Sequence, residues 1–249
     1  MKSIVCVKRV PDSGTRVRIA DDGSGIDTSG VKYVLNPYDE FAVEEAIQLR
    51  EEREEGSVTA LCLGPADAEE QLRNALAMGA DDAVLLEAEP PMDGLTVARA
   101  LAGELEDRDF DLLFFGKQAI DDDNMQVPPM VAEMLGLPCA TVVVDLEVED
   151  GVATAHREVE GGHETVEMEL PAVVSAQKGL NEPRYADLKG IMAAKKKPME
   201  EKEVELADPS TELLSMREPE EGGEGEIVGE GPEAAPELAR RLHEEAKVL

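Results

Sequence analysis

The sequence predicts an α/β protein with a doubly wound, mostly parallel sheet. Short apolar runs alternate with helix-length amphipathic segments through residue 144, a pattern typical of parallel strands joined by crossover helices. Between residues 140 and 176 the pattern changes to short strand-like runs separated by glycine-containing turns, which predicts a β-meander. We therefore expect a Rossmann-like domain over residues 1–198 and an extended C-terminal arm over residues 199–249.

Strands and helices are expected to alternate in the first half of the chain. A Val/Ile-rich run at residues 3–10 predicts a buried first strand, and the glycine-rich polar stretch after it is long enough for a hairpin or a lid. Asn36 is placed to cap the next helix, Pro37 suits its first turn, and apolar residues then recur at helical spacing. The same criteria predict strands at 57–63, 83–87 and 110–115 and helices at 66–78, 94–106 and 126–135.

The second half of the chain begins with the meander and ends in the arm. Strands are expected at 140–148, 152–159 and 164–169, followed by one more apolar strand at 170–176. After residue 198 the chain is rich in Glu, Gly and Pro and cannot fill a core. Helical spacing returns at 233–247, so we expect the arm to end in a helix that needs a partner surface.

The charge balance is strongly acidic. The chain carries 56 Asp and Glu against 24 Lys and Arg, a formal net charge of -32. Because these carboxylates are spread along nearly the whole chain, we favour a strongly solvated, halophile-like surface, with a basic protein partner as the second interpretation. Nucleic-acid binding is not expected, since phosphate contacts need a larger basic footprint than one short segment.

The cysteines and the N-terminus indicate a cytoplasmic protein. Cys6, Cys62 and Cys139 are far apart in apolar runs and form no CxxC pair, which favours buried reduced thiols. The first residues lack the apolar core and cleavage site of a signal peptide, and no run approaches the ~20 apolar residues that span a bilayer. We expect no membrane insertion.

A nucleotide pocket is predicted where several elements end at one edge of the sheet. The loop at 116–126 follows a predicted strand and precedes a helix, and in open α/β sheets such loops bind ligands. The helix start at 36–39 and the strand end at 6–8 should meet it there. Because Asp121, Asp122 and Asp123 would repel a phosphate, backbone N–H groups should face the ligand, unless these carboxylates only cap the helix.

Groups that break bonds are not evident. The sequence has no phosphate-binding GxxxxGK[ST] loop, no GxGxxG after the first strand and no GxSxG elbow. His156, His163 and His243 fall in the meander or the terminal helix, and no His/Cys cluster offers a metal site. We therefore expect a binding protein without catalytic or metal-ligating residues.

Residues 178–197 are locally basic within this acidic chain and carry apolar side chains that look exposed. A lysine-rimmed loop with apolar tips is a common form of weak, fast protein interface, so we expect a docking segment. In the alternative interpretation the lysines counter local acidity or cap a helix C-terminus, and the apolar residues point inward.

Several ordered motifs show that the chain resembles the beta subunit of an electron-transfer flavoprotein along nearly its whole length. The strongest is Leu180-Asn-Glu-Pro-Arg-Tyr185, which continues through Gly190-Ile-Met192 to Lys195-Lys-Lys197. Further matching segments are 7–10, 36–39, 42–46, 75–81, 116–123 with Gln126, 157–162 and 170–174.

The resemblance implies a heterodimeric electron carrier, not an enzyme by itself. A redox-active FAD sits mostly on the alpha subunit, and the beta subunit holds a buried AMP. Electrons arrive from flavin dehydrogenases, such as acyl-CoA dehydrogenases of fatty acid oxidation, and leave to a quinone oxidoreductase. The C-terminal arm is similar to one that packs on the alpha subunit.

The resemblance also implies two sets of site residues. By position, the AMP contacts are Cys6, Asn36, Pro37, Tyr38, Asp39, Leu63, Gly116, Lys117, Gln118, Ala119, Ile120, Asp121, Asp122, Asp123, Asn124, Met125, Gln126 and Val127. The segment around Leu188 anchors on the partner dehydrogenase, and its partner-docking residues are Arg184, Tyr185, Leu188, Ile191, Met192, Lys195, Lys196 and Lys197.

Two alternatives remain open at this point. In an electron-bifurcating relative the beta subunit binds a second FAD and its loop typically reads Asp-Gly-Asp-Thr. Here Asp122-Asp123-Asn124 lacks that Gly and Thr, which favours AMP, whereas residues 126–129 and 176–179 look closer to the bifurcating branch. From another functional class, a stand-alone adenine-nucleotide-binding enzyme or ATP sensor would explain the pocket but not the basic segment or the arm.

Overall fold

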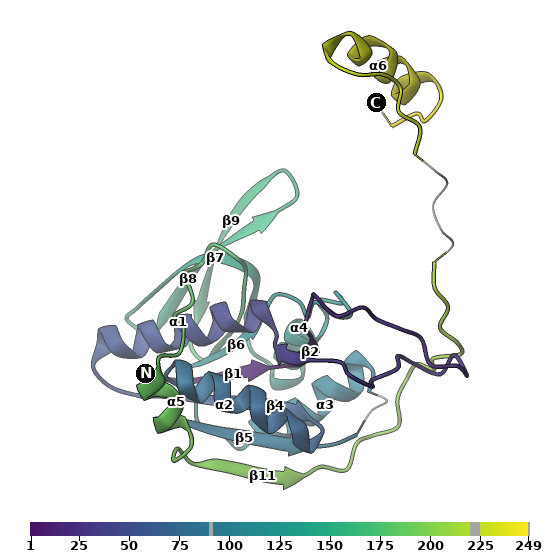
Figure 1. The fold of residues 1–249 in the computed structure, drawn as a ribbon. Coiled ribbons are helices and arrows are strands. Elements are labelled where there is room, and N and C mark those ends of the chain that lie inside the picture. The colour runs from purple at the N-terminus through teal and green to yellow at the C-terminus, as the bar shows by residue number, and fades with distance from the viewer. Residues whose placement is uncertain (90–91, 220–224, 249) are drawn as a thin grey trace. The chain divides into compact units, whose positions relative to one another are not determined.

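A computed structural model describes residues 1–89, 92–219 and 225–248 of the chain. Within these residues the main feature is a nine-stranded sheet with the order β11-β5-β4-β1-β6-β10-β7-β8-β9 (Figure 1). The pairings from β11 to β7 are parallel, and only the β7-β8 and β8-β9 pairs are antiparallel. The doubly wound, mostly parallel fold is confirmed.

The sheet strands agree closely with the predicted runs. Their bounds are β1 Lys2–Val7, β4 Ser57–Gly64, β5 Asp82–Glu87, β6 Leu112–Gly116, β7 Cys139–Glu149, β8 Val152–Val159, β9 Gly162–Glu169, β10 Ala172–Ala176 and β11 Met199–Glu203. The helices are α1 Pro37–Arg53, α2 Glu69–Met78 after the 3-10 turn η1 Ala66–Ala68, α3 Gly94–Leu105, α4 Val127–Leu135, α5 Leu188–Ala194 and α6 Ala235–Glu244 after η2 Pro232–Ala234.

Each face of the sheet buries its own apolar core, because successive side chains of a strand point to opposite faces. Along β1, Val5 and Val7 pack in the core covered by α1 and α2, whereas Ile4 and Cys6 pack in the core covered by α3 and α4. Burial on both faces explains why the central parallel strands are continuous apolar runs.

The order of the strands creates a switch point beside β1. From β1 the chain winds through α1 and α2 to β4 and β5 on one side, and α3 then returns it to β6 on the other side of β1. In open α/β sheets a crevice forms at the carboxyl ends of the strands where the winding reverses. This geometry places the ends of β1 and β6 at a candidate ligand site.

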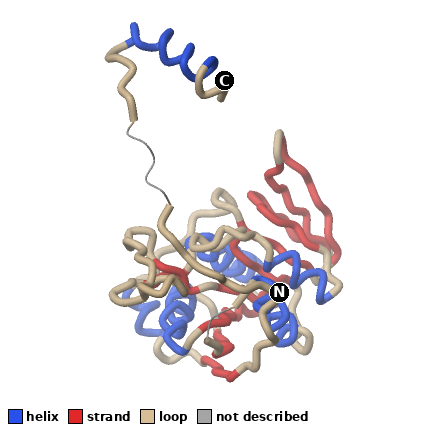
Figure 2. Tube along the Cα trace, turned by 90° about the vertical axis from the view of Figure 1, so that its right-hand side faces the viewer, coloured by secondary structure: helices blue, strands red, loops and turns tan. Residues whose placement is uncertain are grey.

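The meander continues the sheet beyond the helical layers, and Figure 2 shows its three antiparallel strands as a projecting ribbon. The register shifts where β7 leaves β10, and Val142 has a positive φ of 61° there. The Ser175 hydroxyl accepts a hydrogen bond from the Val142 N–H at 3.1 Å, and Arg157 donates to the Thr141 carbonyl at 2.9 Å. These contacts hold the bulge from which the meander turns away.

Three segments differ from the sequence-based expectation. The run at 3–10 is divided, because the Lys8 N–H donates to the Asp39 carboxylate and β2 Arg9–Pro11 then pairs with β3 Tyr33–Leu35. The docking segment contains α5, which Asp187 caps through the Gly190 N–H. The arm expected from residue 199 begins with β11, a charged edge strand that pairs with β5.

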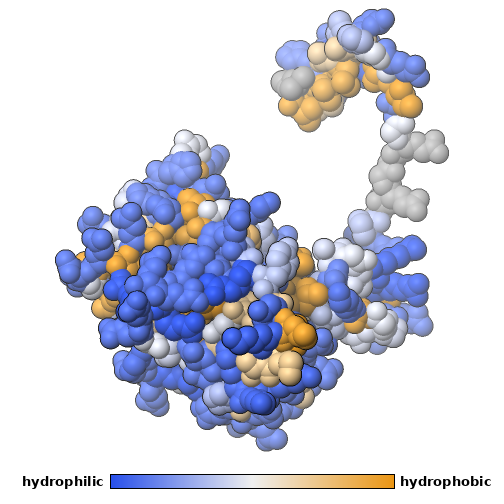
Figure 3. Space-filling view, turned by 60° about the vertical axis from the view of Figure 1, so that its left-hand side comes forward, coloured by the Kyte–Doolittle hydropathy of each residue, from blue (hydrophilic) through white to orange (hydrophobic). Residues whose placement is uncertain are grey.

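By its contacts the chain divides into two units, Met1–Arg18 with Asp27–Leu214, and Ile19–Ile26 with Ser215–Leu249. In the second unit the Met216 N–H donates to the Gly23 carbonyl. On α6, Arg240 pairs with both Glu237 and Glu244. Apolar side chains gather on one side of this terminal segment (Figure 3). The exposed apolar residues of the unit include Ile227 and Leu238. Residues 220–224 and 249 of the expected arm lie outside the described residues.

Candidate functional site

A cavity of about 180 Å³ opens at the switch point of the sheet. Its walls are the ends of β1 and β6, the start of α1, the loop between β6 and α4, and the first turns of α3 and α4. The lining residues are Cys6, Val7, Lys8, Asn36, Asp39, Leu63, Met92, Gly94, Val97, Leu101, Phe115, Gly116, Lys117, Gln118, Ala119, Asp122, Asn124, Met125, Gln126, Val127 and Pro128. Most of these side chains are apolar, which suits a flat ring with few polar contacts.

A buried carboxylate joins the elements around the cavity. Asp39 accepts a hydrogen bond from the Lys8 N–H at 2.7 Å on one oxygen. Its other oxygen accepts from the Asn36 amide at 2.8 Å and from the Gly116 N–H at 3.1 Å. Burial raises the pKa of Asp39 to about 7, although these hydrogen bonds act to lower it. Asp39 therefore fixes the end of β1 to the end of β6.

Asn36 extends the same network into the loop that follows β6. Its side-chain amide also donates to the Gln118 carbonyl at 2.9 Å, and its oxygen accepts from the Ile120 N–H at 3.2 Å. Asn36 is the N-cap residue of α1, as expected, but its side chain makes no capping bond. The residue holds the shape of the cavity-lining loop instead.

Gly116 permits the close approach of α1 to the end of β6. A β-carbon at this position would lie 2.3 Å from Asp39 Oδ1 and 2.7 Å from the Tyr38 carbonyl carbon. Real β-carbons do not approach other atoms this closely, so a side chain here would displace the start of α1. A glycine is required at this position for the Asp39 network to form.

The three aspartates of the loop turn toward partners within the protein. Lys8 Nζ lies 2.8 Å from Asp121 and 3.0 Å from Asp122, and the Gln118 amide donates to Asp123 at 2.5 Å. Burial lowers the pKa of Lys8, but the hydrogen bonds to these carboxylates outweigh it, so the net pKa is raised. The alternative that these aspartates cap the next helix is wrong, because α4 has no side-chain cap.

Most of the predicted cofactor residues lie around the cavity. Five do not line it, namely Pro37, Tyr38, Ile120, Asp121 and Asp123. Sequence reasoning also missed the α3 wall, made by Met92, Gly94, Val97 and Leu101. A signal for that wall was present, because the helix predicted at 94–106 starts after a parallel strand and therefore at the same edge of the sheet.

Among the described residues that line the cavity, the one thiol is not activated as a nucleophile. Cys6 is buried, and burial together with the nearby Asp39 carboxylate raises the pKa of its thiol well above the usual value. Within the described residues no group of three or more His, Cys, Asp or Glu is arranged to hold a metal ion. The helices of the same residues are all too short or too polar to span a bilayer.

The docking segment presents an exposed apolar patch. Tyr185 is 98% exposed and Leu188 74% exposed, and Ile191 and Met192 are exposed beside them on α5. Lys195 and Lys196 are exposed at the end of the same helix. We call these six residues the docking surface. The alternative that its apolar residues point inward is wrong.

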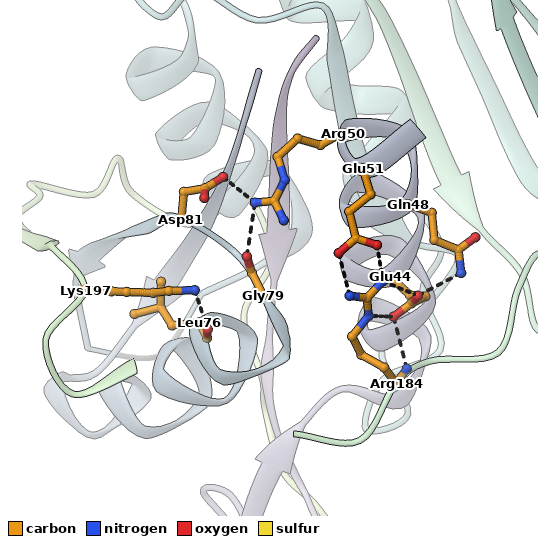
Figure 4. Close-up of polar contacts among 9 residues, drawn as sticks. All are labelled: Glu44, Gln48, Arg50, Glu51, Leu76, Gly79, Asp81, Arg184 and Lys197. Carbon is orange, nitrogen blue, oxygen red and sulfur yellow. Dashed lines mark hydrogen bonds and ion pairs between the residues drawn. The ribbon is translucent and has the colours of Figure 1, made fainter. Parts of the chain in front are cut away.

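Two residues expected in the docking set are occupied within the fold instead (Figure 4). Arg184 pairs with Glu44 and Glu51 on α1. Lys197 donates to the carbonyls of Leu76 and Ala80 at 2.9 and 2.5 Å, so it caps the C-terminus of α2. The helix-capping alternative therefore holds for Lys197, but Lys195 and Lys196 remain exposed.

Comparisons with known proteins show the family of this chain. The model of the electron transfer flavoprotein domain matches residues 24–207. The chain is 42% identical over 260 residues to the electron transfer flavoprotein subunit beta of Bacillus subtilis, with all of both chains covered. It is 44% identical to the subunit of that name from Bradyrhizobium diazoefficiens, again over all of both chains.

The similarity extends to animals. The electron transfer flavoprotein subunit beta of Mus musculus is 40% identical over 258 residues, which cover 100% of this chain and 99% of that protein. Matches of this length include both the cavity-lining loop and the docking surface. The chain therefore belongs to the electron transfer flavoprotein family, as a relative of its beta subunits.

Proposed function

We propose that this chain is the nucleotide-holding and partner-docking beta subunit of a heterodimeric electron-transfer flavoprotein. Electrons enter the complex from a flavin dehydrogenase, such as an acyl-CoA dehydrogenase, and leave to a quinone oxidoreductase. The proposal depends on two features that occur together in this chain, which is similar to beta subunits along its whole length. One is a cavity without an activated nucleophile, and the other is a lysine-rimmed apolar patch far from that cavity in sequence.

The two subunits have different roles: the alpha subunit holds most of the FAD, and this chain binds the partner proteins. FAD, held mainly by the alpha subunit, supplies the electron-accepting ring when bound. This chain contributes the docking surface that brings the dehydrogenase near, and the C-terminal arm that packs on the alpha subunit. Its exposed apolar side chains at Ile227 and Leu238 support that second role, since an interface would bury them.

AMP is the nucleotide that fits this chain best. The enclosed space of about 180 Å³ favours a mononucleotide over a dinucleotide, and Asp122-Asp123-Asn124 in place of Asp-Gly-Asp-Thr supports the same choice. Leu63, Val97 and Leu101 would hold the adenine ring, and backbone N–H groups of the loop before α4 would face the phosphate. Lys8 offsets part of the negative charge of the loop, because Asp121 and Asp122 both pair with it.

Nucleotide extraction from the purified heterodimer tests the proposal. Acid release followed by chromatography should yield one FAD and one AMP per complex. Two FAD and no AMP would assign the chain to the electron-bifurcating branch. A chain that is stable alone and hydrolyses ATP without flavin would overturn the proposal.

A further inference from the structure

The segment before α5 is fixed to α1 by one arginine, Arg184, which pairs with Glu44 and Glu51 of that helix (Figure 4). We call these three residues the fork. Arg184 Nε and Nη2 donate to the two oxygens of Glu44 at 2.9 and 3.0 Å. Arg184 Nη1 and Nη2 donate to the two oxygens of Glu51 at 2.8 and 2.9 Å. One guanidinium therefore holds two carboxylates that lie about two turns apart on one helix, each in the planar two-bond geometry that arginine favours.

Glu44 is the buried half of this fork. The residue is 2% exposed, and it also accepts hydrogen bonds from the Arg184 backbone N–H at 3.0 Å and the Gln48 amide at 2.7 Å. Burial raises the pKa of Glu44, but the hydrogen bonds from Arg184 outweigh it, so the net pKa is lowered. A buried carboxylate with this many donors stays ionised and is costly to leave without its arginine.

The far side of the docking surface is held just as closely, against α2. A β-carbon at Gly190 would lie 2.5 Å from the Ala77 carbonyl oxygen, so α5 touches the α2 backbone there. Arg73 donates to the carbonyls of Ala194 and Lys197 at 2.9 and 3.2 Å. The exposed side chains of α5 therefore stand on a segment that is held at both ends.

We propose that Arg184 is a positioning residue for partner docking: it holds the docking surface in place through Glu44 and Glu51 and does not itself contact the partner. The inference rests on the proposed function, because it assumes that the docking surface binds a dehydrogenase. Holding the segment before the encounter removes part of the ordering cost of binding. An arginine whose donors are used within the fold has little left for a partner.

The test compares variants on both sides of the fork in the purified heterodimer. The measurements are KM and kcat with an acyl-CoA dehydrogenase as the varied electron donor, and amide hydrogen exchange over residues 181–194. Arg184→Gln should raise KM about tenfold at nearly constant kcat and speed the exchange. Glu44→Gln should do the same, although a side chain this buried cannot reach a partner.

Combining the two substitutions sharpens the assignment. The double variant should be no worse than either single variant, because it leaves no unpaired buried charge. Glu51→Gln, at the half-exposed outer carboxylate, should give a smaller rise in KM and serves if Glu44→Gln fails to fold. Arg108→Gln removes a comparable half-buried pair with Glu104 on α3 and should leave KM unchanged.

Two results would overturn the inference. One is a raised KM in Arg184→Gln with wild-type KM in Glu44→Gln and Glu51→Gln, which would make Arg184 a direct contact. The other is unchanged hydrogen exchange over 181–194 in all three variants. Leu188→Ala reports on the docking role separately. If it leaves KM unchanged, the docking part of the proposed function fails, and the exchange data alone decide whether Arg184 holds the segment.

Discussion

The cavity lies at the carboxyl ends of the strands, whereas the docking surface lies on the face of the sheet that α1 and α2 cover, and the two are held by different interactions. Cavity residues such as Cys6 and Phe115 belong to the core under α3 and α4, whereas Ala194 of α5 belongs to the core under α1 and α2. At the cavity, the hydrogen bonds of Asp39 and Asn36 both shape the site and join the strands. At the docking surface, the side chains available to a partner are largely exposed, and the buried ion pairs lie beneath them.

The difference teaches which functions can be changed separately from the fold. A substitution at the cavity should alter nucleotide binding and stability together, because the same atoms serve both. A substitution on the docking surface should alter the encounter with a partner while leaving stability and nucleotide content unchanged. The predictions below test this separation.

The largest effect is expected for Gly116→Val at the cavity. The added β-carbon would meet Asp39 Oδ1 at 2.3 Å and break the hydrogen-bond network, so we expect a loss of about 3 kcal/mol or more of unfolding free energy. Nucleotide should be lost from the complex in parallel. Chemical denaturation and nucleotide extraction measure the two quantities.

Gly103→Ala is the matched control for that substitution. Gly103 lies within α3 and a β-carbon there would meet no atom within 4 Å, so alanine should leave stability equal or raise it by up to about 1 kcal/mol. If Gly116→Val kept its nucleotide while losing stability, the cavity and the fold would not be coupled as described.

Leu188→Ala on the docking surface should weaken the encounter with the dehydrogenase without changing stability. An apolar anchor at the centre of an interface contributes about 2 kcal/mol, so KM for the electron-donating dehydrogenase should rise roughly 30-fold. Unfolding free energy and nucleotide content should not change. Met134→Ala, at another exposed apolar side chain on α4, should leave KM unchanged. An equal rise in that control would argue for a nonspecific loss of surface apolarity.

The sequence is most informative about the centre of the fold. Runs such as 57–63 and 110–115 are largely apolar on both faces, a pattern typical of buried parallel strands. The cavity loop was also predictable, because a loop between a parallel strand and a helix must lie at the ligand-binding edge. These inferences depend on local pattern and on the general geometry of the sheet.

Features that depend on distant contacts were not predictable. Met199-Glu-Glu-Lys-Glu203 looks like a solvated arm, yet it forms an edge strand because β5 offers free backbone groups. Arg184 looks like a docking cation, but its partner Glu44 lies 140 residues earlier in the chain. Such pairings depend on which surfaces the fold brings together. The residues next to Arg184 or Met199 in the sequence therefore do not predict them.

A pH-dependent effect of intermediate size is expected beneath the docking surface, at Glu45. This residue is buried and accepts a hydrogen bond from Asn181 at 2.8 Å. Burial raises its pKa from 4.5 to about 7, with further contributions from neighbouring carboxylates and an opposing one from Asn181. Because the folded pKa lies above the unfolded one, stability contributed by Glu45 is present at low pH and is lost as the pH rises through 7.

Glu45→Gln removes this titration and keeps an oxygen that can accept from Asn181. The variant should match the wild type near pH 4, below the unfolded pKa, and exceed its unfolding free energy at pH 8 by about 1.4 kcal/mol for each pH unit by which folding raises the pKa of Glu45. Chemical denaturation of the heterodimer at the two pH values measures the difference. If the variant and the wild type were equally stable at both pH values, Glu45 would titrate as an ordinary exposed carboxylate. Its ionisation would then not destabilise the fold beneath the docking surface.

The smallest effect is expected for the lysines at the rim, Lys195 and Lys196. Neutralising both to Gln should lower the association rate with an acidic partner surface a few-fold at low salt, because exposed charges steer encounters more than they hold complexes. The effect should vanish near 1 M salt, where charges are screened within about 3 Å. Lys2→Gln, at an exposed lysine paired with Asp109, is the control and should leave the rate unchanged. If the rate loss persisted at high salt, the lysines would be making short-range contacts, and the docking surface would extend past its apolar residues to the end of α5.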